Sequence, residues 1–259
     1  MVSLRISVLG SSSSGNCTFL STSTTRILLD AGFSKIQTSR RLQSIGESLE
    51  SIEAIVISHE HSDHVQGLPS LLSAIDVPIY IAEKTLDAIR SSVSHSRVQS
   101  IRAGERFTIG DLEISPFSVP HDAVDPLAFV FEADGLKVGH VTDLGYMTGL
   151  VIQRLKGCDA IVLESNHDLE MLRSGPYPWH LKQRIMSKHG HLSNDEVGKF
   201  IEESFDGHAR CIILAHLSES NNHPDLARMV SAIALERKGF SLQNLVLASK
   251  TTAIPMIVL

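Results

Sequence analysis

Short runs of apolar residues, separated by turn-forming residues, recur along most of the chain. Runs of this length between turns rich in glycine, serine and proline are typical of strands. They predict strands at residues 4–9, 17–21, 26–29, 52–58, 78–82, 107–109, 112–119, 128–133, 136–141, 160–163 and 211–214. Asp134 and Gly135 join two of these strands in a hairpin-turn pattern.

Helical segments separate the later strands. The pattern predicts helices at residues 39–45, 68–75, 84–91 and 194–204. The last helix has a capping box at its start, because Ser193 is followed by Glu196 three positions later. Antiparallel strands first and alternating strands and helices later predict an α/β fold, in which two sheets pack together under outer helices. We expect a single domain over residues 1–259, because this length suits one hydrophobic core.

Composition narrows the classes of function. The formal net charge of -6 argues against broad electrostatic wrapping of nucleic acid, although a local site remains possible. The cysteines form no Cys-x-x-Cys pair, so neither a disulfide framework nor a thiolate zinc site is indicated. The first residues do not resemble a signal peptide and no apolar stretch reaches about 20 residues, so we expect a cytoplasmic protein with no membrane partner.

The chemistry is concentrated in residues 58–64, which read Ser-His-Glu-His-Ser-Asp-His and follow a predicted strand. By the two-residue period of extended chain, His59 and His61 can point the same way, while Asp63 and His64 can turn toward a second point. Burying these groups unpaired would cost several kcal/mol. The segment therefore predicts the beginning of two metal sites.

Each metal ion needs more ligands than one loop supplies. Three further candidates each follow a predicted strand: His121, Asp143 and His216. His140 competes with Asp143, since the two are close neighbours in the chain. Imidazole and carboxylate ligands together suit zinc or manganese, and the sequence leaves both open.

The order His-x-His-x-Asp-His, His, Asp, His resembles the metallo-β-lactamase superfamily. The resemblance implies an αββα four-layer sandwich and two divalent metal ions, the first bound by His59, His61 and His121, the second by Asp63, His64 and His216, with Asp143 bridging both. It also implies that Asp30 steadies the ligand loop from behind. The flavin-linked di-iron branch carries glutamate where this chain has His61, so oxygen or nitric oxide reduction is disfavoured.

Hydrolysis is the chemistry that two such metal ions support. A water between two cations becomes a hydroxide nucleophile at neutral pH, and the metal ions stabilise charge on the attacked centre. We count Asp63 among the catalytic groups as well as among the ligands. A binding module without catalysis is disfavoured, because every ligand position is filled.

Residues 190–196 resemble the Gly-His segment of the superfamily's transfer-RNA-processing members. The resemblance implies that His191 protonates the leaving oxygen and that Glu164 orients it, a role that can contribute roughly 100-fold to 10,000-fold in rate. In the alternative interpretation His191 only packs at the helix start. His189 is the competing candidate.

Substrate contacts are expected in four segments. The serine- and glycine-rich residues 10–16 could offer backbone N–H groups to a phosphate, although they also fit an ordinary turn. Residues 175–184 combine aromatic and basic side chains, which suits nucleotide stacking, although packing of the tryptophan in the core is the alternative. Together with residues 164–168 and 190–194, these segments give the candidates Ser13, Asn16, Asn166, Trp179 and Ser193.

Together with residues 214–222, these segments resemble the bacterial YycJ (WalJ) family over roughly residues 4–228. The resemblance implies a DNA exonuclease that acts from 5′ ends in DNA repair, and a homo-oligomer is possible. Leu144 departs from the small polar residue expected there. Only about 70 residues separate Asp143 from His216, fewer than a usual domain contains, so substrate binding must come from local loops or a partner.

Two other enzyme classes stay open. A small-molecule metallohydrolase (a lactonase, thioesterase or cyclic phosphodiesterase) would use the same metal ions but would not need His191. An RNA-processing nuclease would use the same site on another nucleic acid. The residues alone do not separate DNA from RNA as substrate.

Overall fold

The computed structural model describes residues 3–90, 97–241 and 245–259, and the chain divides into two compact units. Unit 1 comprises Met1–Ser118, Ala123–Leu136 and Ser249–Leu259, and unit 2 comprises Val119–Asp122 and Lys137–Ala248. No helix in the described part of the chain has both the length and the apolar character that crossing a membrane requires.

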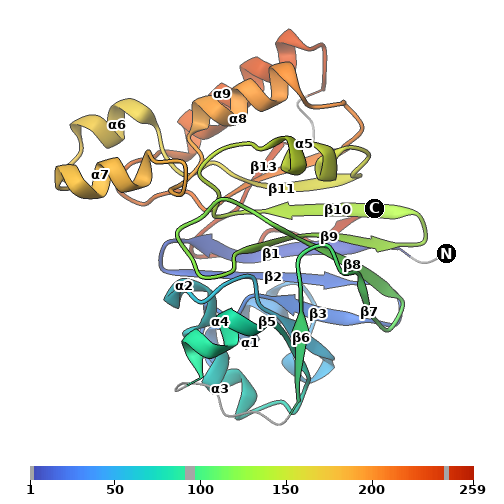
Figure 1. Cartoon of the computed structure of the whole chain (residues 1–259). Helices are drawn as coiled ribbons and strands as arrows, with labels where there is room; N and C mark the ends of the chain where they lie inside the picture. The colour runs from blue at the N-terminus through green and yellow to red at the C-terminus, as the bar shows by residue number, and fades with distance from the viewer. Residues whose placement is uncertain (1–2, 91–96, 242–244) are drawn as a thin grey trace. The chain divides into compact units, whose positions relative to one another are not determined.

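A seven-stranded mixed sheet forms the centre of unit 1 (Figure 1). Its order is β14 (Ile257–Val258), β1 (Arg5–Ser12), β2 (Gly15–Ser21), β3 (Arg26–Leu29), β4 (Ala54–Val56), β5 (Ile79–Ala82) and β6 (Val98–Ile101). The pairs from β14 to β3 are antiparallel and those from β3 to β6 are parallel. The carboxyl ends of β3 and β4 therefore lie at the same edge, and the segments that follow both strands meet there.

Helices and a second group of strands complete unit 1. The helices are α1 (Lys35–Ser44), the 3-10 turn η1 (Leu49–Ser51), α2 (Ser62–Val65), α3 (Leu68–Leu72) and α4 (Glu83–Ile89). The strands β7 (Phe107–Ile109), β8 (Leu112–Ser118) and β9 (Leu127–Ala133) pair antiparallel. Apolar side chains from the sheet and the helices form one buried cluster, which includes Phe19, Leu28, Ile55 and Leu68.

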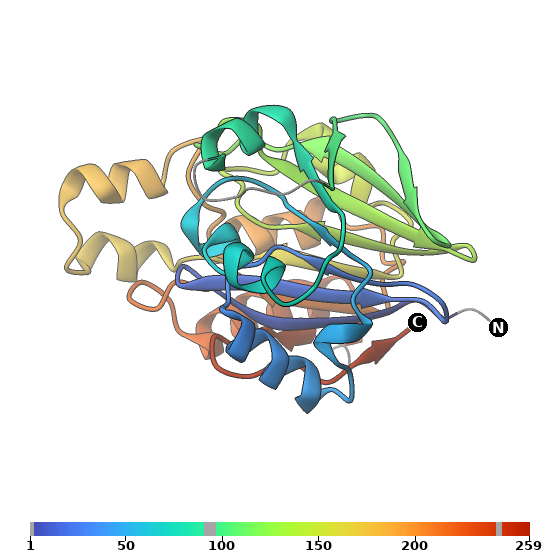
Figure 2. The ribbon, with the colours of Figure 1, turned by 90° about the horizontal axis from the view of Figure 1, so that it is seen from below.

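Parallel strands form the centre of unit 2: β10 (Leu136–Val141), β11 (Ala160–Glu164), β12 (Cys211–Ala215) and β13 (Leu245–Leu247). Its helices are α5 (Gly149–Leu155), α6 (Leu169–Ser174), α7 (Trp179–Ile185), α8 (Asn194–Glu203) and α9 (Pro224–Arg237). Helices α8 and α9 pack closely, since a Cβ atom on Gly198 would lie 3.0 Å from Val230. Figures 1 and 2 both show α6 and α7 projecting together at one end of this unit.

Every predicted strand is present, but several boundaries differ. The predicted turn at residues 10–16 is largely strand, because β1 runs to Ser12 and β2 begins at Gly15, so only Ser13 and Ser14 form the hairpin turn. The predicted helix at 39–45 begins earlier, after a capping box at Ser34. The capping box at Ser193 is present only in part, since Ser193 accepts a hydrogen bond from the backbone N–H of Glu196. Residue 91, the end of the helix predicted at 84–91, lies outside the described residues.

Candidate functional site

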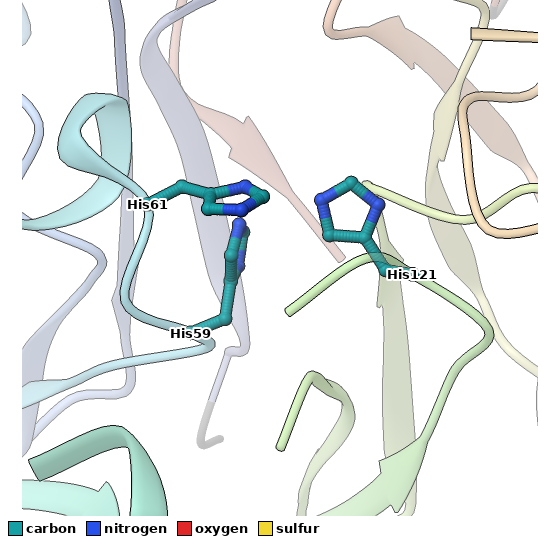
Figure 3. A group of neighbouring side chains, drawn as sticks. All are labelled: His59, His61 and His121. Atoms are coloured by element: carbon teal, nitrogen blue, oxygen red, sulfur yellow. The ribbon is translucent and has the colours of Figure 1, made fainter. Parts of the chain in front are cut away.

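The ligand loop of unit 1 follows β4 directly and continues into α2, for which His61 is the N-terminal capping position. The ring of His59 lies at centroid distances of 4.7 Å from the His61 ring and 4.1 Å from the His64 ring. Figure 3 draws the rings of His59 and His61. It also draws His121, which belongs to unit 2 and is considered below. The imidazole rings of His61 and His64 therefore both lie close to the ring of His59.

Asp30, the residue after β3, supports this loop from behind. Its carboxylate accepts hydrogen bonds from the backbone N–H and the hydroxyl of Ser58, each at 2.9 Å. Its other oxygen lies 2.8 Å from Nδ1 of His64. A carboxylate can only accept, so Nδ1 of His64 carries the proton and Nε2 is the nitrogen with the lone pair.

Asn16 also belongs to this group of side chains. Its amide nitrogen lies 2.9 Å from Oδ2 of Asp63 and 3.1 Å from Nε2 of His64, while its amide oxygen accepts from the Ser11 hydroxyl and the Ser12 N–H. The residue is buried. It therefore contacts two ligand candidates directly, whereas Ser13, the other candidate from this hairpin, is exposed at the turn.

The candidates of unit 2 lie at the carboxyl ends of its parallel strands. Asp143 follows β10, Glu164 ends β11 and His216 follows β12. One potential metal-ligand atom from each of these three residues and one from His191 lie within 4.8 Å of one another. Parallel strands bring their carboxyl ends to the same edge, which explains why residues so distant in sequence meet.

The centre of this group is the buried carboxylate of Glu164. Its Oε1 lies 2.8 Å from Nδ1 of His191 and 2.7 Å from Nδ1 of His216. Its Oε2 accepts hydrogen bonds from the backbone N–H groups of Leu144 and Leu192, both at 3.0 Å. Both oxygens are thus occupied by donors, which fixes the carboxylate and with it the orientation of the two rings.

These contacts shift the pKa values of Glu164 and His191. Burial alone would raise the pKa of Glu164, but the charge of His191 and the hydrogen bonds from both imidazoles outweigh burial and lower the pKa to about 2. Burial alone would lower the pKa of His191, but the charge and the hydrogen bond of Glu164 outweigh it and raise that pKa above its usual range. Glu164 is therefore a carboxylate at neutral pH and favours the protonated form of His191.

His121 is oriented by the same loop that carries His191. Its Nδ1 lies 3.2 Å from the carbonyl oxygen of Gly190, which can only accept, so Nδ1 carries the proton. Its Nε2 lies 3.9 Å from Oδ1 of Asp143. His216 is near the same carboxylate, with its Nδ1 3.4 Å from Oδ1 of Asp143.

Backbone conformation marks several of these positions. In the described residues, the non-glycine residues with positive φ are Asp30 (63°), Asp134 (51°), Asp143 (59°) and His216 (55°). Left-handed conformations cost on the order of 1–3 kcal/mol for such residues and persist where the surrounding structure demands them. Asp134 lies in a hairpin turn, whereas the other three are candidate site residues at strand ends.

The two competing histidines, His140 and His189, lie outside these groups of potential ligands. His140 is buried within β10, and in the part of the chain that the structure describes it belongs to no group of potential ligands. His189 is exposed and is likewise absent from these groups. His167 is buried, and its burial lowers its pKa to about 4 against the opposing charge of Glu164.

The remaining substrate candidates differ in exposure. Trp179 is 63% exposed at the start of α7, so the alternative in which it packs in the core is wrong. Asn166 is buried and donates to the backbone carbonyl of His216 at 2.8 Å. Ser193 caps α8 by accepting from the N–H of Glu196. Asn166 and Ser193 thus hold the backbone around the site residues.

A buried polar network beside Asn166 was missed in the sequence. Asn194 accepts from the Ser165 hydroxyl at 2.7 Å and donates to Asn222 at 2.9 Å, and Asn222 donates to the Ser165 carbonyl at 2.9 Å. This network joins the segments after β11 and β12 to the start of α8. The pair Asn221 and Asn222 was the available signal, since an asparagine side chain can both donate hydrogen bonds to backbone groups and accept them.

The chain is similar to several known proteins. Residues 25–216 match the model of the β-lactamase superfamily domain. The chain is 38% identical over 240 residues to the exodeoxyribonuclease YycJ of Bacillus anthracis, covering 92% of this chain and 91% of that protein. It is also 38% identical over 233 residues to the exodeoxyribonuclease WalJ of Streptococcus pneumoniae serotype 2, covering 88% and 87%.

Solved structures share the fold. The metallo-β-lactamase fold protein YhfI of Bacillus subtilis aligns with a TM-score of 0.73 at 18% identity, covering 97% of this chain and 99% of that one. The short form of human tRNase Z aligns with a TM-score of 0.65 at 17% identity, covering 96% and 98%. The expected fold class, the metallo-β-lactamase type of α/β sandwich, is confirmed. The chain is a metal-dependent hydrolase that belongs to the β-lactamase superfamily and, within it, to the family of YycJ and WalJ.

Proposed function

We propose that this protein is a metal-dependent phosphodiesterase that degrades DNA as an exonuclease from 5′ ends. The observation that carries the proposal is the 2.8 Å contact between His191 and Glu164, since a positioned acid serves the poor alkoxide leaving group of a phosphodiester. Relatives named as exodeoxyribonucleases, at 38% identity over most of the chain, support the same reaction. A cytoplasmic role in DNA repair forms part of the proposal.

The proposed metal ligands are those of the superfamily motif: His59, His61 and His121 for one ion, Asp63, His64 and His216 for the other, and Asp143 as the bridge. The chemistry of these side chains fits divalent metal ions, because imidazole nitrogens and carboxylate oxygens are ligands of zinc and manganese. In His64, His121 and His216, Nδ1 lies beside an oxygen acceptor, which supports Nε2 as the proposed ligand atom of each ring.

The metal ions, when bound, would acidify water and stabilise charge on the attacked phosphate. The residues of the chain have separate tasks. Asp30 holds Ser58 and the ring of His64, and thereby the ligand loop. Glu164 fixes two imidazoles with a single oxygen, so the orientation of His191 is coupled to that of His216.

His191 is the proposed acid. With Nδ1 held by Glu164, a protonated imidazole carries its second proton on Nε2, the nitrogen on the opposite side of the ring. That proton is the one available to the oxygen that leaves phosphorus. Glu164 stays ionised and stabilises the imidazolium, so it acts through His191 and is a positioning residue.

We propose two direct and three indirect contributions to substrate binding. Trp179 is exposed on the projecting α6 and α7 helices, where a nucleobase could stack on it. Ser13 is exposed at a hairpin turn and could meet a phosphate. Asn16, Asn166 and Ser193 are proposed to act indirectly, through the side chains and backbone that they hold.

The test is degradation of end-labelled nucleic acid by purified protein loaded with zinc or manganese. Duplex, nicked and single-stranded DNA, and RNA of the same sequence, would be labelled at either the 5′ or the 3′ end. We expect early release of 5′-labelled mononucleotide from DNA, with loss of this activity in EDTA. Efficient hydrolysis of a β-lactam or a glutathione thioester, with every nucleic acid intact, would contradict the proposal and support a small-molecule hydrolase.

A further inference from the structure

A pocket of about 360 Å³ adjoins His191 within unit 2. Its walls come from the segment after β10, from α6, from the segment after α7 and from the start of α8. The volume falls within the range of roughly 300–1,000 Å³ that small-molecule sites occupy. The side chains that give it chemical character are Tyr146, Arg173, Lys188, His191 and Glu196, and we call it the Tyr146 pocket.

Close backbone packing builds one wall of the pocket. A Cβ atom on Gly145 would lie 2.2 Å from the carbonyl oxygen of Lys188, so only glycine lets the two loops approach this closely. The approach sets Nζ of Lys188 6.0 Å from the centroid of the Tyr146 ring. The aromatic ring and the ammonium group are thereby neighbours, although they are 42 positions apart in the chain.

The wall formed by α6 is also held in place. Nζ of Lys182 donates to the carbonyl oxygens of Arg173 and Gly175, at 2.6 Å and 2.7 Å. These bonds tie α7 to the end of α6, the helix that brings Arg173 to the pocket. The position of the Arg173 backbone is therefore set by contacts that do not involve a ligand.

The chemistry of the pocket fits a nucleotide. Tyr146 is 41% exposed and offers a ring on which a base can stack, which is worth roughly 1–3 kcal/mol per base. Arg173 and Lys188 supply two positive charges and Glu196 one negative charge, so these three groups leave one positive charge for a phosphate. A purely apolar substrate would form no favourable interaction with this positive charge.

We propose that the Tyr146 pocket binds the nucleotide on the leaving-group side of the scissile phosphodiester. This inference rests on the proposed function. His191 lines the pocket, and an acid must lie beside the oxygen that it protonates, so the sugar that carries this oxygen belongs at the pocket. In cleavage from a 5′ end, that sugar belongs to the terminal nucleotide.

The reaction then balances as a hydrolysis. The oxygen of water forms a bond to phosphorus, the bond between phosphorus and O3′ of the terminal nucleotide breaks, and His191 gives its proton to O3′. The water proton passes to solvent, from which His191 is protonated again. The products are a 5′-mononucleotide in the Tyr146 pocket and a shortened strand with a new 5′-phosphate. A pocket for one nucleotide thus accounts for removal of nucleotides one at a time.

The experiment compares Tyr146→Ala and Lys188→Ala with Lys238→Ala, which removes an exposed lysine that does not line the pocket. Binding of deoxyadenosine 5′-monophosphate is measured by calorimetry on metal-loaded protein. Because Tyr146→Ala removes one stacking contact, it should weaken mononucleotide binding roughly 5-fold to 150-fold. KM for a 5′-phosphorylated oligonucleotide should rise in parallel in Tyr146→Ala and Lys188→Ala, whereas Lys238→Ala should leave both mononucleotide binding and KM within about twofold of the wild-type values.

Tyr146→Phe keeps the ring and should restore binding and KM, which separates stacking from a general loss of folding. Unchanged mononucleotide binding in both alanine variants would overturn the inference, as would equal loss in Lys238→Ala. If the wild-type protein degraded no DNA, the proposed function would fail, while calorimetry would still decide on the pocket. In that case selective loss of binding in Tyr146→Ala would support the pocket, and absence of binding to the wild-type protein would overturn it.

Discussion

The Nδ1 atom of His191 lies 2.8 Å from Oε1 of Glu164. The same oxygen lies 2.7 Å from Nδ1 of His216, and the other oxygen of the carboxylate accepts two backbone N–H groups. One buried side chain therefore positions the proposed acid and a proposed metal ligand together. Its removal should affect the reaction, the metal ions and the fold at once.

Glu164→Gln tests this coupling. The amide cannot accept at both positions, so at least one N–H donor around it loses its acceptor, at a cost on the order of 1–3 kcal/mol in the free energy of unfolding. Weaker orientation of His216 should lower metal affinity roughly 10-fold to 100-fold. Urea unfolding and metal titration measure the two effects. Glu170→Gln on the exposed face of α6 is the matched control, and equal behaviour of both variants would refute the coupling.

Asp30→Ala should lower metal content without removing a ligand. Ser58 and His64 lose their shared acceptor, so the ligand loop is no longer held, and metal affinity should fall roughly 10-fold to 100-fold. Metal content after dialysis against a fixed zinc concentration measures this loss.

Two variants bracket the Asp30 result. Asp76→Ala removes an exposed aspartate and should keep the full metal content. Asp143→Ala removes the proposed bridging ligand and should lose at least as much metal as Asp30→Ala. Full metal content in Asp30→Ala would show that the loop holds its shape without this carboxylate.

The ligand loop and the strands that precede the site residues could be predicted, because both depend on short stretches of sequence. Residues 59–64 follow an apolar run in the sequence, and the rings of His59 and His64 are also neighbours in the folded chain. The contact between Asn16 and Asp63 spans 47 positions and depends on the pairing of strands. No pattern within a short stretch of sequence predicts such a contact.

Several helices of unit 2 were also missed. Helices α6 and α7 are short, and they are joined by a proline-containing segment that resembled a binding loop. Trp179 lies exposed on α7, although its size alone favoured burial. The approach of Gly145 to Lys188 likewise follows from the fold. The single-domain organisation stays a prediction.

Acid should weaken one ion pair of unit 2 in a predictable direction. Burial alone would raise the pKa of Asp159, but hydrogen bonds from the Lys137 N–H and from Arg210, with the charge of Arg210, lower it below its ordinary value of 3.8. Because the pKa of Asp159 is lower in the folded than in the unfolded protein, its ionised carboxylate stabilises the fold at any pH above the unfolded-state pKa. This stabilisation is lost as the pH falls through the folded-state pKa.

Asp159→Asn should therefore unfold at lower urea concentration than the wild-type protein at neutral pH, by on the order of 1 kcal/mol in the free energy of unfolding. The difference between the two proteins should narrow below pH 3.8. Urea midpoints at a neutral and an acidic pH measure it, with Asp76→Asn as an exposed control. A difference that widened in acid would contradict this assignment.

The central claim is that His191 protonates the leaving oxygen of a phosphodiester, and His191→Ala tests it most directly on two substrates. Turnover of DNA should fall roughly 100-fold or more, because its alkoxide leaves poorly without a proton. Hydrolysis of bis(p-nitrophenyl) phosphate, whose leaving group needs little protonation, should be much less affected, with metal content unchanged. Equal loss on both substrates, accompanied by loss of metal, would show that His191 is a ligand or a structural residue.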